Sequence, residues 1–243
     1  MKTNLLALLQ EESEMKLKGG LYHQTQIKLA FNSNRIEGSE LSEEQTRYIF
    51  ETNTIGICEN ESANVDDIIE TVNHFICFDY MLATAHEELS QRHIKEYHRL
   101  LKSSTTDSRK KGFNVGEYKS RPNAVGDTRT TSPSKVIGEM TKLLREYNAK
   151  ASVTFEEIIA FHHKFECIHP FQDGNGRVGR VIMFRECLRN DITPFIVGHE
   201  HKMFYYRGLK EWGNERGFLL DTCLSAQDAY QKHVDYFYPQ LTD

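Results

Sequence analysis

The stretch His169-Pro-Phe-Gln-Asp-Gly-Asn-Gly-Arg-Val-Gly-Arg180 is a glycine-rich turn between two helical patterns. Before it, apolar residues recur at helical spacing from Phe155 to Cys167, and after it they recur from Val181 to Leu188. A turn that runs directly into a helix presents free backbone N–H groups and the positive end of the helix dipole to an anion. The stretch therefore predicts a phosphate site at a helix start.

Two glycines and two arginines in this stretch favour a polyphosphate ligand. The amides of Gly174 and Gly176 can converge on one phosphate. Arg177 and Arg180 lie three positions apart and so share a helix face. An arginine in the first turn opposes the helix dipole at a cost of roughly 0.3–1 kcal/mol. A bound polyanion offsets that cost, and two arginines therefore indicate one.

Three more side chains of the stretch have chemical or structural roles. His169 can accept a proton near neutral pH. Asp173 is a hard oxygen ligand beside a phosphate site, where Mg²⁺ is usually held by one carboxylate and the substrate phosphates. Phe171 is expected to point the other way and to anchor the loop in the core.

Other interpretations of the stretch fit less well. The run Gly174 to Gly179 formally matches the dinucleotide-binding pattern G-x-G-x-x-G, but that pattern requires a preceding strand, and a helical pattern precedes it here. A metal hydrolase would use His162, His163 and His169. Neighbouring helix positions do not point into one site, and His162 lies on the apolar face, so we expect it to be a packing residue.

The composition of the 243 residues is that of an ordinary globular protein, with 39% hydrophobic and 27% charged residues. A net charge of -5 gives no basis for nucleic-acid binding, and no run of apolar residues is long enough to span a membrane. The cysteines are odd in number and form no C-x-x-C pair, which favours a reducing cytoplasm. They are Cys58, Cys77, Cys167, Cys187 and Cys223.

Most of the chain has the periodicity of amphipathic helices, so the fold class is expected to be all-α. Ser42 and Gln45 form a capping-box pattern, and Ser132-Pro133 is a typical helix start. The helical patterns cover residues 42–50, 65–89, 133–147, 155–167, 181–188 and 218–238.

Residues 102–133 do not fit a helix, because they are rich in serine, threonine, glycine, lysine and arginine. Within them, Asn123-Ala-Val-Gly-Asp-Thr-Arg-Thr130 places Gly126-Asp127 between two short strand-like runs. That arrangement predicts a β-hairpin.

The stretch His169–Arg180 matches H-x-F-x-[D/E]-G-N-G-R-x-x-R at every fixed position and so resembles the signature of the Fic family. The resemblance extends over about residues 65–198. It implies an all-α fold with a short hairpin flap, and transfer of AMP from ATP to a Ser, Thr or Tyr hydroxyl of a target protein. It also implies that His169 deprotonates this hydroxyl and that Asp173 holds Mg²⁺ against the α- and β-phosphates.

The resemblance further assigns the contacts to ATP. It implies that Asn175, with the amides of Gly174 and Gly176, orients the α-phosphate. Arg177 is expected to bind the β-phosphate and Arg180 the γ-phosphate. The flap is expected near residues 116–131, where the family pairs it with an extended segment of the target. Its docking residues would be Asn123, Ala124, Val125 and Gly126.

A second motif lies near the N-terminus. In Ser33-Asn-Arg-Ile-Glu37-Gly38, Glu37 lies four residues after Ser33 on the same helix face, and Gly38 is a typical residue for ending a helix. A glutamate in a last turn opposes the helix dipole, unless a cation from elsewhere compensates it. The motif resembles the family's inhibitory sequence, [S/T]-x-x-x-E-[G/N]. It implies that Glu37 pairs with Arg180 in place of the γ-phosphate.

The direction of the reaction stays open at this point. Glu37 can also position a water that removes AMP from a modified protein, with the same His169 protonating the leaving hydroxyl. Another donor, such as one that supplies phosphocholine or phosphate, fits less well with two arginines. A nucleotide-gated interaction module without turnover would not need His169. The target protein and a homo-oligomeric state cannot be inferred from the sequence.

One structural unit with three parts is expected. Residues 1–64 would form N-terminal helices with the inhibitory motif at 33–38. Residues 65–200 would be the Fic core, and residues 201–243 would form C-terminal helices packed on it.

Overall fold

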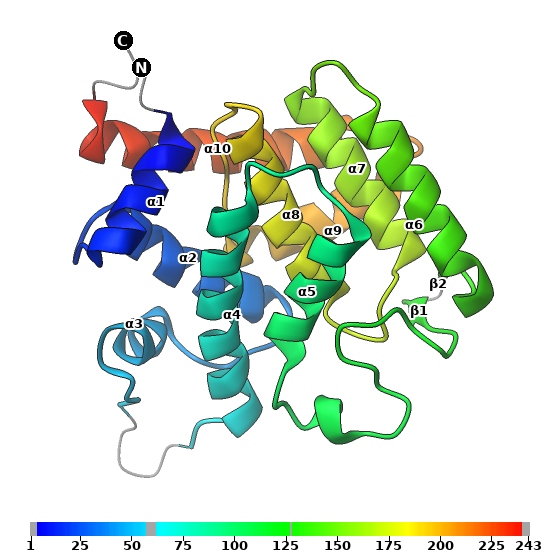
Figure 1. The fold of residues 1–243 in the computed structure, drawn as a ribbon, viewed down its shortest axis with the longest axis horizontal. Coiled ribbons are helices and arrows are strands. Elements are labelled where there is room, and N and C mark those ends of the chain that lie inside the picture. The colour runs from blue at the N-terminus through cyan, green and yellow to red at the C-terminus, as the bar shows by residue number, and fades with distance from the viewer. Residues whose placement is uncertain (1–3, 57–61, 127, 240–243) are drawn as a thin grey trace.

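A computed structural model describes residues 4–56, 62–126 and 128–239, so Cys58 and Asp127 lie outside the described residues. Ten α-helices and one two-stranded hairpin dominate the described ranges, which confirms the all-α expectation (Figure 1). The helices are α1 (Leu5–Met15), α2 (Leu21–Ile36), α3 (Glu43–Thr52), α4 (Val65–Thr84), α5 (Gln91–Lys102), α6 (Pro133–Asn148), α7 (Phe155–Ile168), α8 (Asn175–Arg189), α9 (Lys202–Glu211) and α10 (Gly217–Phe237). The strands are β1 (Ala124–Val125) and β2 (Thr128–Arg129), and the short 3-10 helices are Asp107–Arg109 and His199–His201.

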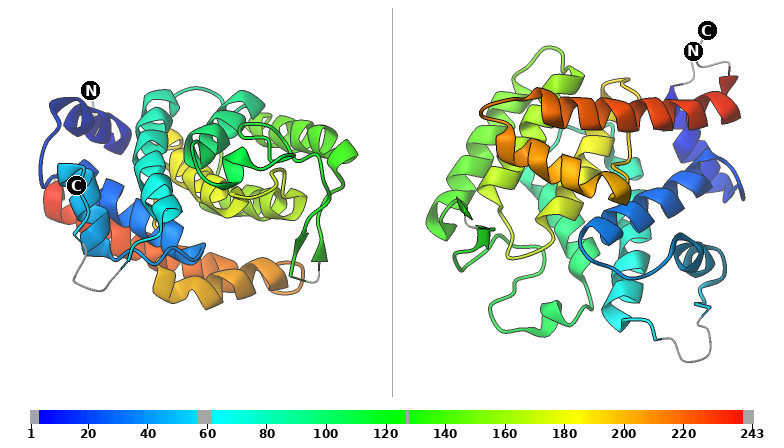
Figure 2. Two further views of the ribbon diagram at one scale, coloured as in Figure 1. Left: turned by 90° about the horizontal axis from the view of Figure 1, so that it is seen from below. Right: turned by 180° about the vertical axis from the view of Figure 1, so that it is seen from behind.

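Helix α8 is the central element, and it begins where the glycine-rich stretch ends. It packs against α1, α2, α4, α5 and α7, and nearly all of its residues are buried, polar ones included. Helices α9 and α10 lie across the back of the molecule, where α10 packs on α2 and α7 (Figure 2). Charged side chains near the start of α8 are therefore held by neighbours on several sides.

Caps mark the helix starts that the sequence indicated. Ser42 accepts from the amide of Gln45 and the Gln45 side chain accepts from the amide of Ser42, which is the expected capping box of α3. Pro133 begins α6 directly after Ser132. Helix α10 extends through Phe237, before Pro239. These local signals involve neighbours in the chain and so are visible in the sequence.

Two expected helices have different bounds, and one helix was missed. Helix α4 ends at Thr84 rather than near Leu89, because the buried Arg185 side chain donates to the carbonyls of Thr84 (3.0 Å) and Glu87 (2.6 Å). Helix α8 extends six residues before the apolar pattern that begins at Val181, and it starts directly after the glycine-rich turn, as the phosphate-site interpretation expected. Helix α5 was not predicted, because histidines and a lysine occupy part of its buried face.

No helix in the described ranges has the length and apolar character required to cross a bilayer.

Candidate active site

The glycine-rich stretch forms a tight loop that delivers the chain into α8. Gly174 has φ +77°, a conformation that favours glycine, and it immediately precedes the helix. The buried Asn175 side chain closes the loop, since it accepts from the amide of Phe171 (2.8 Å) and donates to its carbonyl (3.0 Å). Both polar ends of Asn175 are therefore engaged within the loop. Its expected contact with the α-phosphate stays a prediction.

Phe171 anchors this loop in the core, as expected. It is fully buried, and its ring stacks on His98 of α5 with centroids 4.0 Å apart and planes 2° apart. The imidazole of His98 in turn accepts from the amide of Gly116 (2.9 Å), in the segment that leads to the hairpin. Phe171 and His98 thereby connect the glycine-rich loop to α5 and to the segment that precedes the hairpin.

His169 is the residue that ends α7, with φ +50°, and its amide donates to the carbonyl of Phe165 at 2.8 Å. Burial and the nearby Lys119 ammonium lower the pKa of His169 to about 4. Glu166 lies with Oε2 3.7 Å from His169 Nδ1, and burial raises the pKa of Glu166 to about 8. At neutral pH the imidazole is thus neutral and able to accept a proton, and its glutamate neighbour is protonated.

Arg180 binds the N-terminal motif. Its Nη2 atom lies 2.6 Å from Glu37 Oε1 and 3.0 Å from the carbonyl of Ser33, and its Nε donates to Ser33 Oγ at 3.0 Å. Arg180 is only 3% exposed. Burial raises the pKa of Glu37, but Arg180 and Arg177 outweigh that effect, so the pKa is lowered and Glu37 is ionised. The expected pairing of Glu37 with Arg180 is therefore present.

Glu37 reaches this position because α2 ends immediately before it. Gly38, at φ +108°, donates to the carbonyl of Arg35, and Ser39 donates to that of Asn34, which together form a Schellman cap. The next residue, Glu40, donates its amide to Asp67 Oδ2 at 2.8 Å, which ties the segment after the cap to the start of α4. The backbone is thus fixed on both sides of Glu37.

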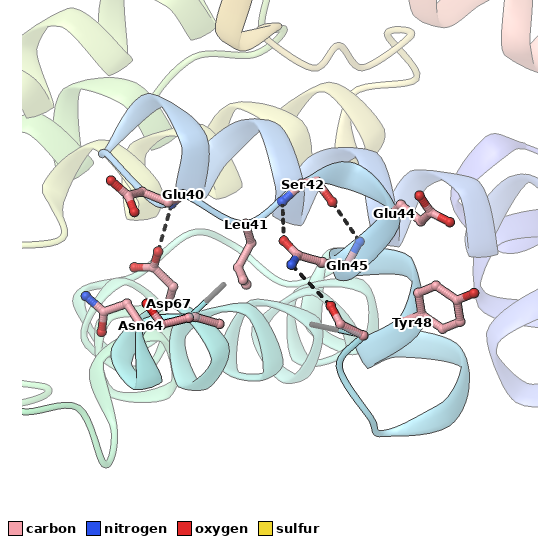
Figure 3. Close-up of a pocket in the computed structure, with 11 residues that line it drawn as sticks. Glu40, Leu41, Ser42, Glu44, Gln45, Tyr48, Asn64 and Asp67 are labelled. Carbon is pink, nitrogen blue, oxygen red and sulfur yellow. Dashed lines mark hydrogen bonds between the residues drawn. The ribbon is translucent and has the colours of Figure 1, made fainter. Parts of the chain in front are cut away.

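The contact between Glu40 and Asp67 borders a hollow of about 640 Å³ (Figure 3). Leu41, Ser42 and Tyr48 line it on one side and Asn64 on the other. None of the residues of the stretch His169–Arg180 lines this hollow. It is therefore separate from the candidate active site.

Glu37 covers the start of α8. A Cβ atom added to Gly176 would overlap Oε1 of Glu37 and lie 3.0 Å from Arg180 Nη1. The carboxylate thus occupies the place above the first helical turn where an anion is favoured. Glycine at position 176 allows this close approach.

A second charged cluster surrounds Arg177 and Asp173, and two of its members were missed in the sequence. Arg177 lies 2.5 Å from Glu70 Oε2 of α4 and 3.3 Å from Asp173 Oδ2. Lys102, the last residue of α5 and only 2% exposed, lies 2.7 Å from Asp173 and 2.6 Å from Glu70. Glu70 and Lys102 stand alone in the sequence as ordinary surface charges, and only their burial reveals the cluster.

Asp173 fits the role of a Mg²⁺ ligand that acts together with substrate phosphates. Its side chain is 47% exposed, and although burial raises its pKa, Arg177 and Lys102 lower that pKa to about 2. Its carboxylate is therefore ionised and half-exposed, and in this structure it is paired with Lys102 and Arg177. No group of three or more potential metal-ligating side chains occurs in residues 4–56, 62–126 and 128–239. A single carboxylate such as Asp173 is the protein ligand expected where substrate phosphates supply the other oxygens of Mg²⁺.

The predicted β-hairpin is present beside the glycine-rich loop. Ala124 pairs with Arg129 and Val125 with Thr128, in antiparallel register. Gly126 has φ +54°, and Val125 is 51% exposed at the tip. The docking role expected for Asn123 to Gly126 stays a prediction.

The histidines of α7 do not form a metal site. His162 is buried and hydrogen-bonded through Nε2 to the hydroxyl of Tyr205 at 2.6 Å, as expected for a packing residue. His163 instead stacks on Trp212.

Comparison with known families agrees with this geometry. Residues 88–187 match the model of the Fic/DOC family, and this range contains the whole stretch His169–Arg180. This chain contains a Fic/DOC domain. The Fic domain begins after α4, so Glu37 and Glu70 lie outside the matched range.

Two curated relatives extend the similarity beyond the Fic domain. The chain is 25% identical over 224 residues to protein adenylyltransferase fic-1 of Caenorhabditis elegans, covering 88% of this chain and 42% of the relative. It is 26% identical over 201 residues to protein adenylyltransferase Fic of Aedes aegypti, covering 79% and 38%. The chain thus spans less than half the length of these relatives.

Solved structures share the arrangement of the helices. A Fic domain containing signaling protein from Bacteroides thetaiotaomicron superposes with a TM-score of 0.72 at 24% identity, covering 97% of this chain and 92% of the other. Fic-1 from C. elegans superposes with a TM-score of 0.71 at 21% identity, covering 94% and 69%. The fold around the Fic domain is therefore shared over almost the whole chain.

Proposed function

We propose that this chain is an autoinhibited protein adenylyltransferase that moves AMP from ATP to a Ser, Thr or Tyr hydroxyl of a target protein. The observation that carries the proposal is the meeting of His169, Asp173, Arg177 and Arg180 at the start of α8, with Glu37 on Arg180. The names of the curated relatives support the same activity. The scattered cysteines of the sequence favour a cytoplasmic location.

In the proposed reaction, the neutral imidazole of His169 takes the proton of the target hydroxyl. The hydroxyl oxygen bonds to the α-phosphorus, the bond from that phosphorus to the bridging oxygen of the β-phosphate breaks, and pyrophosphate leaves. The amides at Gly174 and Gly176 and the dipole of α8 stabilise the charge that develops on the α-phosphate. Arg177 and Arg180 hold the β- and γ-phosphates in line. A Mg²⁺ ion held by Asp173 would neutralise phosphate charge.

The resting arrangement opposes this reaction at two places. Glu37 occupies Arg180, and a γ-phosphate needs the same guanidinium. Lys102 and Arg177 both bind Asp173, so its carboxylate is already compensated. The first contact is the proposed inhibitory one, because Glu37 also covers the anion site above Gly176. ATP then binds productively only when the carboxylate withdraws.

The test uses ATP labelled at the α-phosphate with the wild type, Glu37→Gly and His169→Ala. We expect label on the enzyme or on lysate proteins, more with Glu37→Gly than with the wild type and none with His169→Ala. Label from ATP carrying the isotope at the γ-phosphate should stay absent, which separates AMP transfer from phosphate transfer. Equal labelling by the wild type and Glu37→Gly would overturn the inhibitory role. No label with either would overturn transfer.

The reverse reaction is the second candidate, because Glu37 lies over the start of α8, where a carboxylate can also orient a water. In that case His169 would protonate the leaving hydroxyl of a modified protein. A protein carrying AMP would lose it with the wild type and keep it with Glu37→Gly. Attachment of AMP should increase in Glu37→Gly, whereas removal of AMP should be lost, so this variant distinguishes the two directions of the reaction.

A further inference from the structure

Lys119 is a buried cation whose partners are all uncharged. It is 4% exposed, and among the described residues its ammonium contacts only uncharged oxygen atoms. Burial lowers the pKa of its ammonium to about 8. Burying an unpaired charge is costly, so a lysine at this position indicates a role for its three donors.

The three donors join the two ends of the hairpin to Ile168, the last residue of α7. Lys119 Nζ donates to Asn123 Oδ1 (2.7 Å) and to Thr130 Oγ1 (2.7 Å), and it lies 3.3 Å from the carbonyl of Ile168. Asn123 directly precedes β1 and Thr130 directly follows β2. Ile168 directly precedes His169. One ammonium group therefore contacts both ends of the hairpin and the residue before the proposed base.

Two more bonds attach the same segment on the other side of His169. The amide of Lys119 donates to the carbonyl of Pro170 at 2.8 Å, and Asn123 Nδ2 donates to that of Phe171 at 2.9 Å. We call Lys119, Asn123 and Thr130 the flap-base network. Through it the carbonyls on both sides of His169 are bound to the base of the hairpin, while the tip with Val125 stays exposed.

We propose that Lys119 is a positioning residue, which sets the distance between a hydroxyl held by the hairpin and the imidazole of His169. This proposal rests on the proposed function, in which the hairpin presents the target. An in-line reaction requires the reacting atoms to be about 3–3.5 Å apart, and a shift of about 1 Å can cost about 100-fold in rate. A network that fixes hairpin and base to one another provides such precision. Binding of ATP, which uses the start of α8, does not depend on it.

The experiment compares variants in the Glu37→Gly background, so that transfer is measurable. Lys119→Met should lower the maximal rate of protein labelling about 10- to 100-fold, with the KM for ATP and the Kd for Mg-ATP within two-fold of the parent. Lys119→Arg should recover part of the rate, because it restores the charged donors. Lys111→Met, which changes an exposed lysine of the preceding loop, is the matched control and should label like the parent.

A second pair of variants tests the proposal even if Lys119→Met does not fold. Thr130→Val removes one partner of Lys119 with little change of shape and should lower the labelling rate several-fold, whereas Thr131→Val should leave it unchanged. An unchanged labelling rate in both Lys119→Met and Thr130→Val would overturn the proposal. A loss of rate that is explained by weaker binding of Mg-ATP would also overturn it.

Hydrogen exchange separates this proposal from the proposed function. Absence of label in the Glu37→Gly parent would refute transfer itself. Faster exchange of the hairpin amides in Lys119→Met, with α8 unchanged, is still expected from the flap-base network. Unchanged exchange of these amides would overturn the network's role whatever the activity.

Discussion

Replacing Glu37 by glutamine tests the proposed inhibition most directly, because it removes the charge and keeps the shape. Glycine would also loosen the backbone at this helix end, which glutamine does not. In the variant, Arg180 keeps both contacts to Ser33, each 3.0 Å long, and loses only the charged partner at 2.6 Å. The change therefore isolates one charge-assisted hydrogen bond.

The size of the effect follows from that bond. A hydrogen bond to a charged group contributes about 1.5–3 kcal/mol, and each 1.4 kcal/mol is a factor of ten. If ATP must displace Glu37 to react, the fraction of competent enzyme rises by the same factor when the bond is lost. We expect labelling at low ATP concentration to rise about 10- to 150-fold in Glu37→Gln. Initial rates at ATP concentrations below KM measure it, with the exposed Glu40→Gln as control.

The Glu37→Gln variant should be less stable than the wild type, although it labels protein faster. Glu37→Gln leaves the buried Arg180 without its counter-charge, so the free energy of unfolding should fall by about 1.5–3 kcal/mol. For a chain of this length that corresponds to a decrease of roughly 3–12 °C in Tm. Saturating Mg-ATP should restore part of it, because a γ-phosphate replaces the carboxylate. A less stable variant whose labelling stays within two-fold of the wild type would refute inhibition and leave Glu37 a purely structural partner.

Two further variants test single contacts of the site and the core. Ser33→Ala removes only the hydrogen bond from Arg180 Nε, which contributes a net of about 0.5–1.5 kcal/mol. It should therefore raise the initial rate of labelling about 2- to 10-fold, which is less than Glu37→Gln. A larger gain than with Glu37→Gln would contradict this prediction. The pKa of the buried His162 is lowered to about 3, so below pH 6.5 the unfolded chain binds more protons than the folded one and stability falls as the pH falls. His162→Gln should reduce this fall by about 1.4 kcal/mol per pH unit between pH 6 and 4 in urea unfolding, whereas an identical pH dependence would show that His162 does not cause it.

The sequence predicted those parts of the site that local signals determine. The turn from His169 to Gly174 and the helix that follows depend on glycines and spacing within one segment. The pair of Glu37 and Arg180 was accessible only because both lie in motifs that resemble the Fic family. Capping residues such as Ser42 indicated helix starts correctly because their partners lie three residues away.

What could not be predicted depends on contacts between distant segments. Glu70 and Lys102 meet Arg177 only after α4, α5 and α8 have packed together. Lys119 lies in a polar loop, where a lysine is ordinarily exposed, and its burial depends on contacts with Ile168 and Pro170, about fifty residues further along the chain. The end of α4 is set by Arg185, about one hundred residues further along the chain. No pattern within a single segment contains such information.

The way α2 ends has a consequence for the time course of the reaction. Ile27, Ala30 and Ile36 of this helix are fully buried, whereas the Glu37 side chain, just beyond its end, is 28% exposed. Withdrawal of the carboxylate thus requires rotation about side-chain bonds and no displacement of the helix. Such rotations equilibrate far faster than the turnover of most enzymes. Progress curves started by adding ATP should therefore be linear from the first seconds, and a lag would indicate that a slower event, such as modification of the chain itself, releases Glu37.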